Sequence, residues 1–130
     1  MIGAQLQDAI RDRLIAENVA DGQIYDRIPP SAVFPYVEIG DEQTNDDGDQ
    51  CAEMFEVYVD LHIWSRAAGR YEAKAIGEDC RKALAAGITV AEYHIILDEF
   101  ETSRILVDPD GLTTHGVVTF RYLLQPVLGP

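Results

Sequence analysis

The sequence predicts an α+β fold in which an antiparallel sheet of about four strands carries two helices on one face, in the order helix-strand-strand-helix-strand-strand. Apolar and polar residues alternate along residues 54–65 and 114–125, which is the pattern of half-buried strands. Apolar residues recur at helical spacing along residues 2–18 and 65–86. The chain has 130 residues, which is close to the usual size of one domain, so we expect a single domain over residues 1–130.

The first third of the chain is predicted to hold one helix and two strands. In residues 2–18 one stripe of the helix is apolar and consists of Ile2, Leu6, Ala9, Ile10 and Leu14. Asp21-Gly22 ends this helix, and Ile24-Tyr25 fits a short strand. The two prolines of Arg27-Ile28-Pro29-Pro30-Ser31 predict a rigid extended connector. A second strand is expected over residues 36–40.

An acidic loop and the clearest strand of the chain are predicted next. Residues 41–50 contain no apolar side chain to bury, so they are expected to form a polar loop. Residues 54–65 are expected to form a strand whose two faces differ in polarity. Its core face is predicted to consist of Phe55, Val57, Val59, Leu61 and Ile63.

The second half is predicted to form a helix and two strands. Ser65 is expected to cap a helix that runs to about Ala86 and ends at Gly87. Its stripe is rich in alanine, which predicts close packing on the sheet: Ala73, Ile76, Cys80, Ala83 and Leu84. Residues 93–107 are extended but alternate irregularly, which predicts a bend or bulge. After the turn at residues 108–111, the strand over residues 114–125 is expected to bury Val118, Phe120, Tyr122 and Leu124.

The charge of the chain is strongly negative and uneven. Lysine and arginine number 10 against 23 aspartate and glutamate residues, which gives a net charge of −13. Such a chain is repelled by phosphate backbones, so we expect no direct binding to DNA or RNA. Residues 28–65 contain no Lys or Arg and nine acids. This block repels itself unless it is solvated, neutralised by a cation or faced by a basic partner.

Neither a membrane segment nor a disulfide framework is expected. No apolar run approaches the roughly 20 residues that a spanning helix needs, and the first residues lack the pattern of a secretory signal. Cys51 and Cys80 have no metal-binding or redox spacing. They are predicted to be two reduced thiols.

The search for catalytic and metal-binding motifs predicts no catalytic residue, cofactor or metal. Nucleotide-binding, nucleophile-elbow and zinc-protease motifs are absent. The histidines, His62, His94 and His115, are far apart in the sequence and are expected on a strand face and in surface or turn positions. The acidic loop lacks the Asp and Glu positions of an EF-hand. A looser cation site formed by Asp46, Asp47 and Asp49 is the alternative to a solvated charge run.

The second face of the strand over residues 54–65 is a candidate protein interface. Glu56, Asp60 and His62 project from it about 7 Å apart at each step, together with Met54, Tyr58 and Trp64. Large aromatic side chains mixed with charges favour an interface over a catalytic pocket. The alternative is that this face packs under the helices. Likewise, Trp64 and Arg66 are either interface anchors or, with Ser65 as cap, part of the core where strand meets helix.

Three segments of the chain carry a family resemblance. The first comprises residues 24–30 and 34–40, and the second comprises residues 57–72 with the core Leu61-His62-Ile63-Trp64-Ser65-Arg66. The third runs from Ser103-Arg104 into residues 108–116. In order and spacing, over nearly the whole chain, they resemble the tail-completion, or tail-terminator, family of long-tailed phages and gene transfer agents.

The resemblance implies a structural virion protein and no enzyme. It implies a subunit of a ring, commonly a hexamer, that caps the tail tube, stops its polymerisation and joins the tail to the head. The implied partners are further copies of the chain, the major tail tube protein and the head-proximal connector or adaptor protein. DNA would pass through the ring without specific binding, and no membrane is involved. The implied location is the head-proximal end of the virion tail, after assembly in the bacterial host cytoplasm.

Six residues are candidates for contacts in such an assembly, either with the lumen or with partner proteins: Asp46, Asp47, Asp49, Tyr58, Trp64 and Arg66. The alternatives for the function are a head-closure or adaptor ring at the connector and, from a different class, a monomeric acidic domain that binds cations or hydrolyses a substrate.

Overall fold

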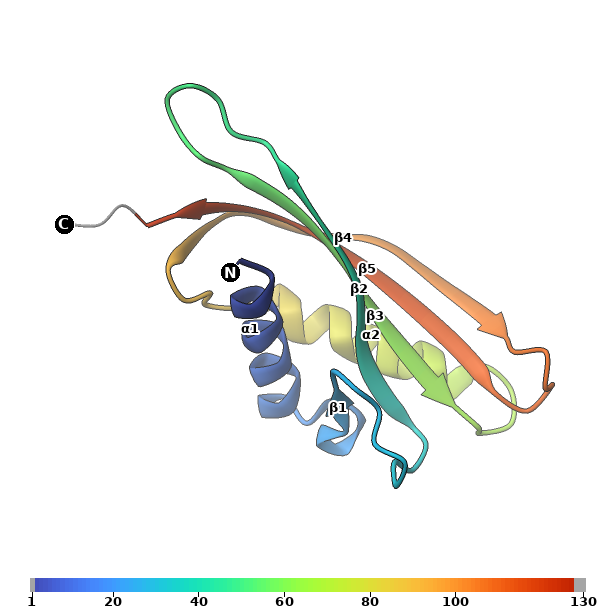
Figure 1. Cartoon of the computed structure of the whole chain (residues 1–130). Helices are drawn as coiled ribbons and strands as arrows, with labels where there is room; N and C mark the ends of the chain where they lie inside the picture. Colours follow the sequence, from blue (N-terminus) through green and yellow to red (C-terminus); the bar gives the residue numbers. More distant parts are fainter. Residues whose placement is uncertain (1, 128–130) are drawn as a thin grey trace.

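The computed structural model describes residues 2–127 and confirms the predicted fold class. A five-stranded sheet in the order β1-β2-β3-β5-β4 carries both helices on one face (Figure 1). The elements in chain order are α1 (Ile2–Ala16), the short 3-10 helix η1 (Val19–Gly22), β1 (Ile24–Tyr25), β2 (Tyr36–Asp46), β3 (Phe55–Ser65), α2 (Tyr71–Ala85), β4 (Tyr93–Val107) and β5 (Thr114–Pro126).

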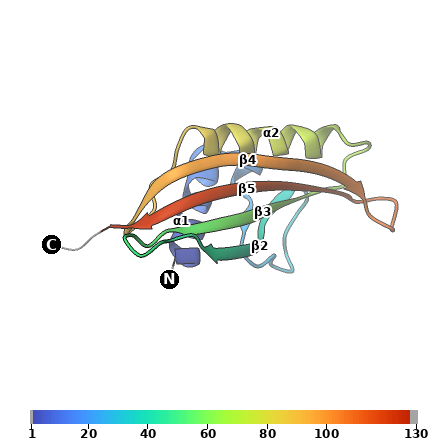
Figure 2. The ribbon, with the colours of Figure 1, turned by 90° about the horizontal axis from the view of Figure 1, so that it is seen from above.

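The sheet is antiparallel except at one edge. β2, β3, β5 and β4 lie side by side in that order and pair antiparallel (Figure 2). The Ile24-Tyr25 segment adds a fifth strand, which pairs parallel to β2 at Val37 and Glu38. None of the helices in residues 2–127 has the length and apolar character needed to cross a membrane.

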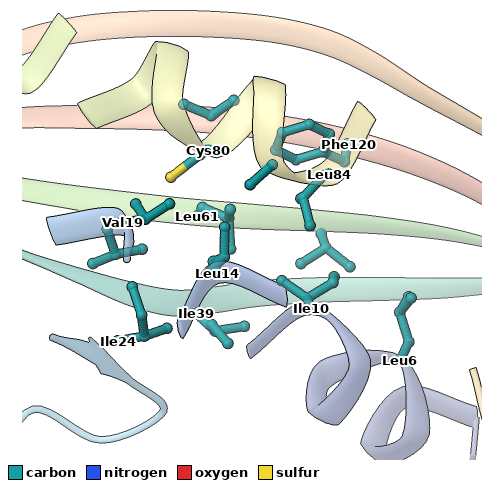
Figure 3. Close-up of a cluster of buried hydrophobic side chains, with 14 of the residues drawn as sticks. Leu6, Ile10, Leu14, Val19, Ile24, Ile39, Leu61, Cys80, Leu84 and Phe120 are labelled. Atoms are coloured by element: carbon teal, nitrogen blue, oxygen red, sulfur yellow. The ribbon is translucent and has the colours of Figure 1, made fainter. Parts of the chain in front are cut away.

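The core lies between the sheet and the two helices. Val57, Val59, Leu61 and Ile63 of β3 are fully or almost fully buried, as the alternation predicts, whereas Phe55 at the strand's start is half-buried. Figure 3 shows the cluster that they join: residues of α1, α2 and the strands meet with their apolar side chains pointing toward one another. Burying a side chain of this size stabilises the fold by about 1.5–3 kcal/mol.

Both helices pack an apolar stripe against the sheet. α1 contributes Leu6, Ile10 and Leu14, which are spaced by four residues and are fully buried. The buried stripe of α2 contains small residues, which allow this helix to approach the sheet closely. A Cβ on Gly77 would already contact Ile63 and Val118 at 3.4 Å. The alanine-rich stripe thus predicts the close packing correctly.

α2 begins later than the sequence predicts. Ser65 does not cap this helix: it is the last residue of β3, pairs with Thr114 and is fully buried. Its Oγ accepts a hydrogen bond from the Ala67 N–H and donates one to Glu72 Oε1 at 2.7 Å. The pairing with β5 keeps the chain extended to this point, so the helix starts only at Tyr71. Its end after Ala85, followed by Gly87 at φ +96°, agrees with the prediction.

The predicted loop at residues 41–50 is partly wrong, because β2 continues to Asp46. Backbone pairing with β3 maintains this strand although it has nothing apolar to bury. The β2–β3 hairpin extends beyond the helices (Figure 1), so polar side chains on both of its faces remain in water. This half of the strand therefore has no alternation of apolar and polar residues from which it could be predicted.

Bulges interrupt two of the strands. β4 shifts register between Ile95 and Leu97 and again between Phe100 and Thr102, as its irregular alternation predicts. β2 shifts between Ile39 and Glu42. Before this bulge the even-numbered residues of β2 face away from the helices, and after it the odd-numbered residues do, because Gln43 pairs with Tyr58.

Candidate functional site

The open face of the sheet, on the side away from the helices, carries charged, polar and aromatic side chains in close contact with one another. We define it by the outward residues of the three central strands: Glu38, Glu56, Tyr58, Asp60, His62, Trp64, His115, Val117, Thr119 and Arg121. Except for the buried Val117, these side chains are half-buried, although no helix covers them. The alternative that this face packs under the helices is therefore wrong.

A stack of rings occupies one end of the open face. Trp64 and His115 lie directly opposite each other on β3 and β5, with ring centroids 3.9 Å apart and planes 6° apart. His62 Nδ1 lies 2.7 Å from His115 Nε2, and Trp64 Nε1 donates to Glu38 Oε1 at 3.2 Å. Burial, followed by the nearby His62, lowers the pKa of His115. Trp64 thus lies outside the core, and the interpretation of this residue as a core plug is wrong.

A network of opposite charges crosses the open face near the β2–β3 hairpin. Arg121 of β5 donates to Glu56 at 2.7 Å and to Glu99 of β4 at 2.9 Å. Asn45 donates to the same Glu56 carboxylate, and the Tyr58 hydroxyl lies 3.5 Å from it. The hydrogen bond from Arg121 lowers the pKa of Glu56, and the Asn45 hydrogen bond adds to this effect. Tyr58 therefore belongs to a satisfied polar network, which orders this part of the face.

Asp41, Asp60 and His62 form a third cluster beside the stack. One potential ligand atom from each lies within 4.8 Å of the others, and in residues 2–127 this is the only such group of three His, Cys, Asp or Glu side chains. The sequence predicted no metal site because its histidines are widely spaced. The β3–β5 pairing brings His62 and His115 together, and the β2 bulge adds Asp41. The missing information for the group of Asp41, Asp60 and His62 was the register between β2 and β3, including the bulge.

The three acids of the predicted loop lie at the tip of the β2–β3 hairpin. Asp46 Oδ1 accepts a hydrogen bond from the Gly48 N–H at 2.9 Å. Asp49 Oδ1 accepts from the N–H groups of Cys51 and Ala52. Asp47 is exposed. Two of the three carboxylates thus hold the turn in shape, and they do not converge on a common cation-binding point among the described residues.

Arg66 lies at the opposite end of the sheet, in the connection between β3 and α2. Its guanidinium lies 4.5 Å from the centre of the Phe34 ring, and its Nε donates to Thr113 Oγ1 at 3.2 Å. Arg66 and Arg70 line a shallow pocket that the exposed Leu112 also borders. This is a basic and apolar surface in an otherwise acidic chain.

The six candidate interface residues consequently fall into separate regions. Asp46 pairs with Phe55, and Trp64 lies nine residues further along β3, which corresponds to about 30 Å. The structure therefore places Asp46, Asp47 and Asp49 at one end, Tyr58 in the middle, and Trp64 and Arg66 at the other end. None of these positions has the nucleophile, base and oxyanion-binding groups of an active site.

Comparison with known proteins gives a consistent result. A family described as tail completion protein gp17 matches residues 4–125 of the chain. The tail completion protein gp17 of Bacillus phage SPP1 is 25% identical over 93 residues, which cover 71% of this chain and 69% of that protein.

Two solved structures share the fold. A chain in the virion of a native gene transfer agent particle superposes with a TM-score of 0.87 at 22% identity, over 95% of this chain and 97% of that chain. The structure of SPP1 gp17 gives a TM-score of 0.64 at 21% identity, over 97% of this chain and 91% of that chain.

Proposed function

This chain belongs to the tail completion protein gp17 family, and from that membership we propose that it is a tail terminator. Its role is structural, in the virion tail, and it is not an enzyme. The proposed terminator is a ring, with six copies as the expected number, that caps the tail tube, ends its polymerisation and joins tail to head. The observation that carries this proposal is the family match over residues 4–125, supported by the likeness to a chain of an assembled gene transfer agent particle.

The edges of the sheet are suited to such a ring. A closed ring of identical subunits needs two different surfaces that complement each other. β4 forms one edge and exposes Ile96, Phe100 and Leu106, whereas the hairpin half of β2 forms the other edge and is polar. Unpaired strand edges readily accept another chain. We assign the contacts between neighbouring copies to these edges.

The charge of the chain fits a channel for DNA. With a net charge of −13, a ring of this protein repels the phosphate backbone and lets DNA pass without retaining it. We place Asp46, Asp47 and Asp49 either at the lumen or against a basic patch of the neighbouring ring. The partners in this proposal are the major tail tube protein on one side and the head-proximal connector on the other.

The test is the absolute mass of the protein in solution, measured by light scattering after size exclusion. It is measured alone, with the cognate tube protein, and with the cognate connector protein. A species of six times 14.4 kDa, alone or only on the tube, supports the terminator. A ring that binds the connector but ignores the tube would instead indicate an adaptor. A monomer that binds neither protein contradicts both.

A further inference from the structure

We propose that Asp41, Asp60 and His62 form a binding site for a divalent transition-metal ion such as Zn²⁺. The cluster lies on the open face between β2 and β3 and combines one imidazole with two carboxylates, whose ligand atoms lie within 4.8 Å of one another. Zinc binds these donor types at about 2.0–2.2 Å and is commonly held by three protein ligands with a fourth position for water. The proposal concerns the isolated subunit and does not depend on ring formation.

The β2 bulge builds this cluster. Regular alternation would send Asp41 to the same face as Ile39, which is buried in the core. Between Ile39 and Glu42 the register shifts, so that Gly40 and Asp41 together lie opposite Asp60. Bulges commonly redirect a side chain beside a functional site. Here the bulge brings Asp41 to the carboxylate of Asp60.

Gly40 provides the space for the imidazole. A Cβ on Gly40 would overlap the Cδ2 and Nε2 atoms of His62, so the ring lies directly against the bare backbone of the bulge. The other ring nitrogen, Nδ1, is 2.7 Å from His115 Nε2. This leaves Nε2 of His62 as its free ligand atom, pointing at the bulge.

The surrounding residues orient two of the three ligands. When His62 Nδ1–H donates to His115 Nε2, the lone pair of His62 Nε2 is available to a metal ion, and stacking on Trp64 holds His115 in place. Thr119 Oγ1 donates to Asp60 Oδ1 at 2.6 Å, which fixes that carboxylate. Such outer partners are a usual part of metal sites, because they set the tautomer and orientation of the ligands.

The local charge favours a cation over an empty site. Residues 28–65 contain nine acids and no Lys or Arg, and none of the ion pairs formed within residues 2–127 includes Asp41 or Asp60. Calcium and magnesium prefer six or more oxygen ligands, whereas this cluster offers three donors, one of which is nitrogen. The donor set therefore favours a divalent transition metal such as Zn²⁺ over calcium and magnesium.

The experiment is a calorimetric titration of the untagged, full-length chain with zinc chloride in a buffer that does not bind metal. We expect one Zn²⁺ per chain, and a loss of affinity of about tenfold or more in Asp60→Asn and in His62→Gln. Magnesium and calcium chloride should bind far more weakly. In thermal unfolding, Zn²⁺ at 100 times its Kd should raise the Tm of the wild type by roughly 5–10 °C.

The controls use residues of the same kind outside the cluster. His94→Gln removes an exposed histidine of β4, and Asp47→Asn removes an exposed acid of the hairpin tip; both should bind Zn²⁺ like the wild type. Circular dichroism establishes that each variant folds. If His62→Gln does not fold, Asp41→Asn, which alters an exposed side chain, takes its place. Absence of binding to the wild type, or equal binding by His62→Gln or Asp41→Asn, overturns the site.

Discussion

Asp110 shows how one exposed carboxylate orders a turn. Its Oδ1 accepts hydrogen bonds from the N–H groups of Leu112 and Thr113, and its Oδ2 accepts one from the Thr113 hydroxyl. The bonds from Leu112 and Thr113 lower the pKa of Asp110. A carboxylate whose pKa is lower in the folded chain stabilises the fold above its unfolded pKa of about 3.9 and loses this effect as the pH falls.

We therefore predict that Asp110→Ala lowers the Tm by a few degrees at pH 7, and that the difference from the wild type shrinks as the pH falls below 4. Thermal unfolding followed by circular dichroism between pH 7 and pH 2.5 measures it. Asp110→Asn, which keeps an acceptor oxygen, should lose less than the alanine variant. A difference that stays constant down to pH 2.5 contradicts the role of the charge.

The packing of α2 on the sheet leads to a prediction at the level of elements. Gly77 faces Ile63 and Val118, and the 3.4 Å clearance at its Cβ position is that of an ordinary contact. Gly77→Ala should therefore stabilise the protein by up to about 1 kcal/mol, because glycine is costly within a helix. Gly77→Leu overpacks the same contact and should destabilise by about 1–3 kcal/mol. Urea unfolding measures both, and a stabilising leucine would contradict the close approach.

The elements also show what the sequence could and could not predict. Core strands and helix stripes were predictable because each has a buried face, as in β3, where every second residue from Val57 to Ser65 is buried. The hairpin half of β2 was not predictable, because a strand without a buried face carries no alternation. The start of α2 was misjudged because Ser65 is a typical capping residue, yet pairing with Thr114 keeps it extended as the last residue of β3.

The side-chain clusters of the open face were predicted less well than the core. The sequence indicated an interface on the second face of β3, and the structure places Trp64 on that open face. It did not indicate the His62–His115 pair, since that contact depends on the register between β3 and β5. Residues brought together by strand pairing leave no local pattern in the chain.

At the scale of the whole molecule, the acidic tip of the β2–β3 hairpin extends beyond the helices, so we expect changes in it to affect folding little. The three acids are exposed and none belongs to the core cluster, so Asp46→Asn, Asp47→Asn and Asp49→Asn combined should change the Tm by only a few degrees. Asn keeps the acceptor oxygens that hold the turn. In particles, the triple variant should alter DNA passage or docking, read as a change in infectivity or particle yield. Unchanged infectivity and yield would remove these acids from the proposed lumen or partner contact.

The bulge in β2 switches the outward face from even-numbered to odd-numbered residues, and this limits how the hairpin strand can change in length. Every residue between the bulge and the hairpin tip takes its facing from the one extra residue at Gly40-Asp41. Inserting or deleting an odd number of residues there moves the side chains of this part of β2 to the opposite face of the hairpin. An even number changes only the length of the strand. The length of this hairpin strand should therefore vary among related proteins in steps of two residues, so that each side chain keeps its face.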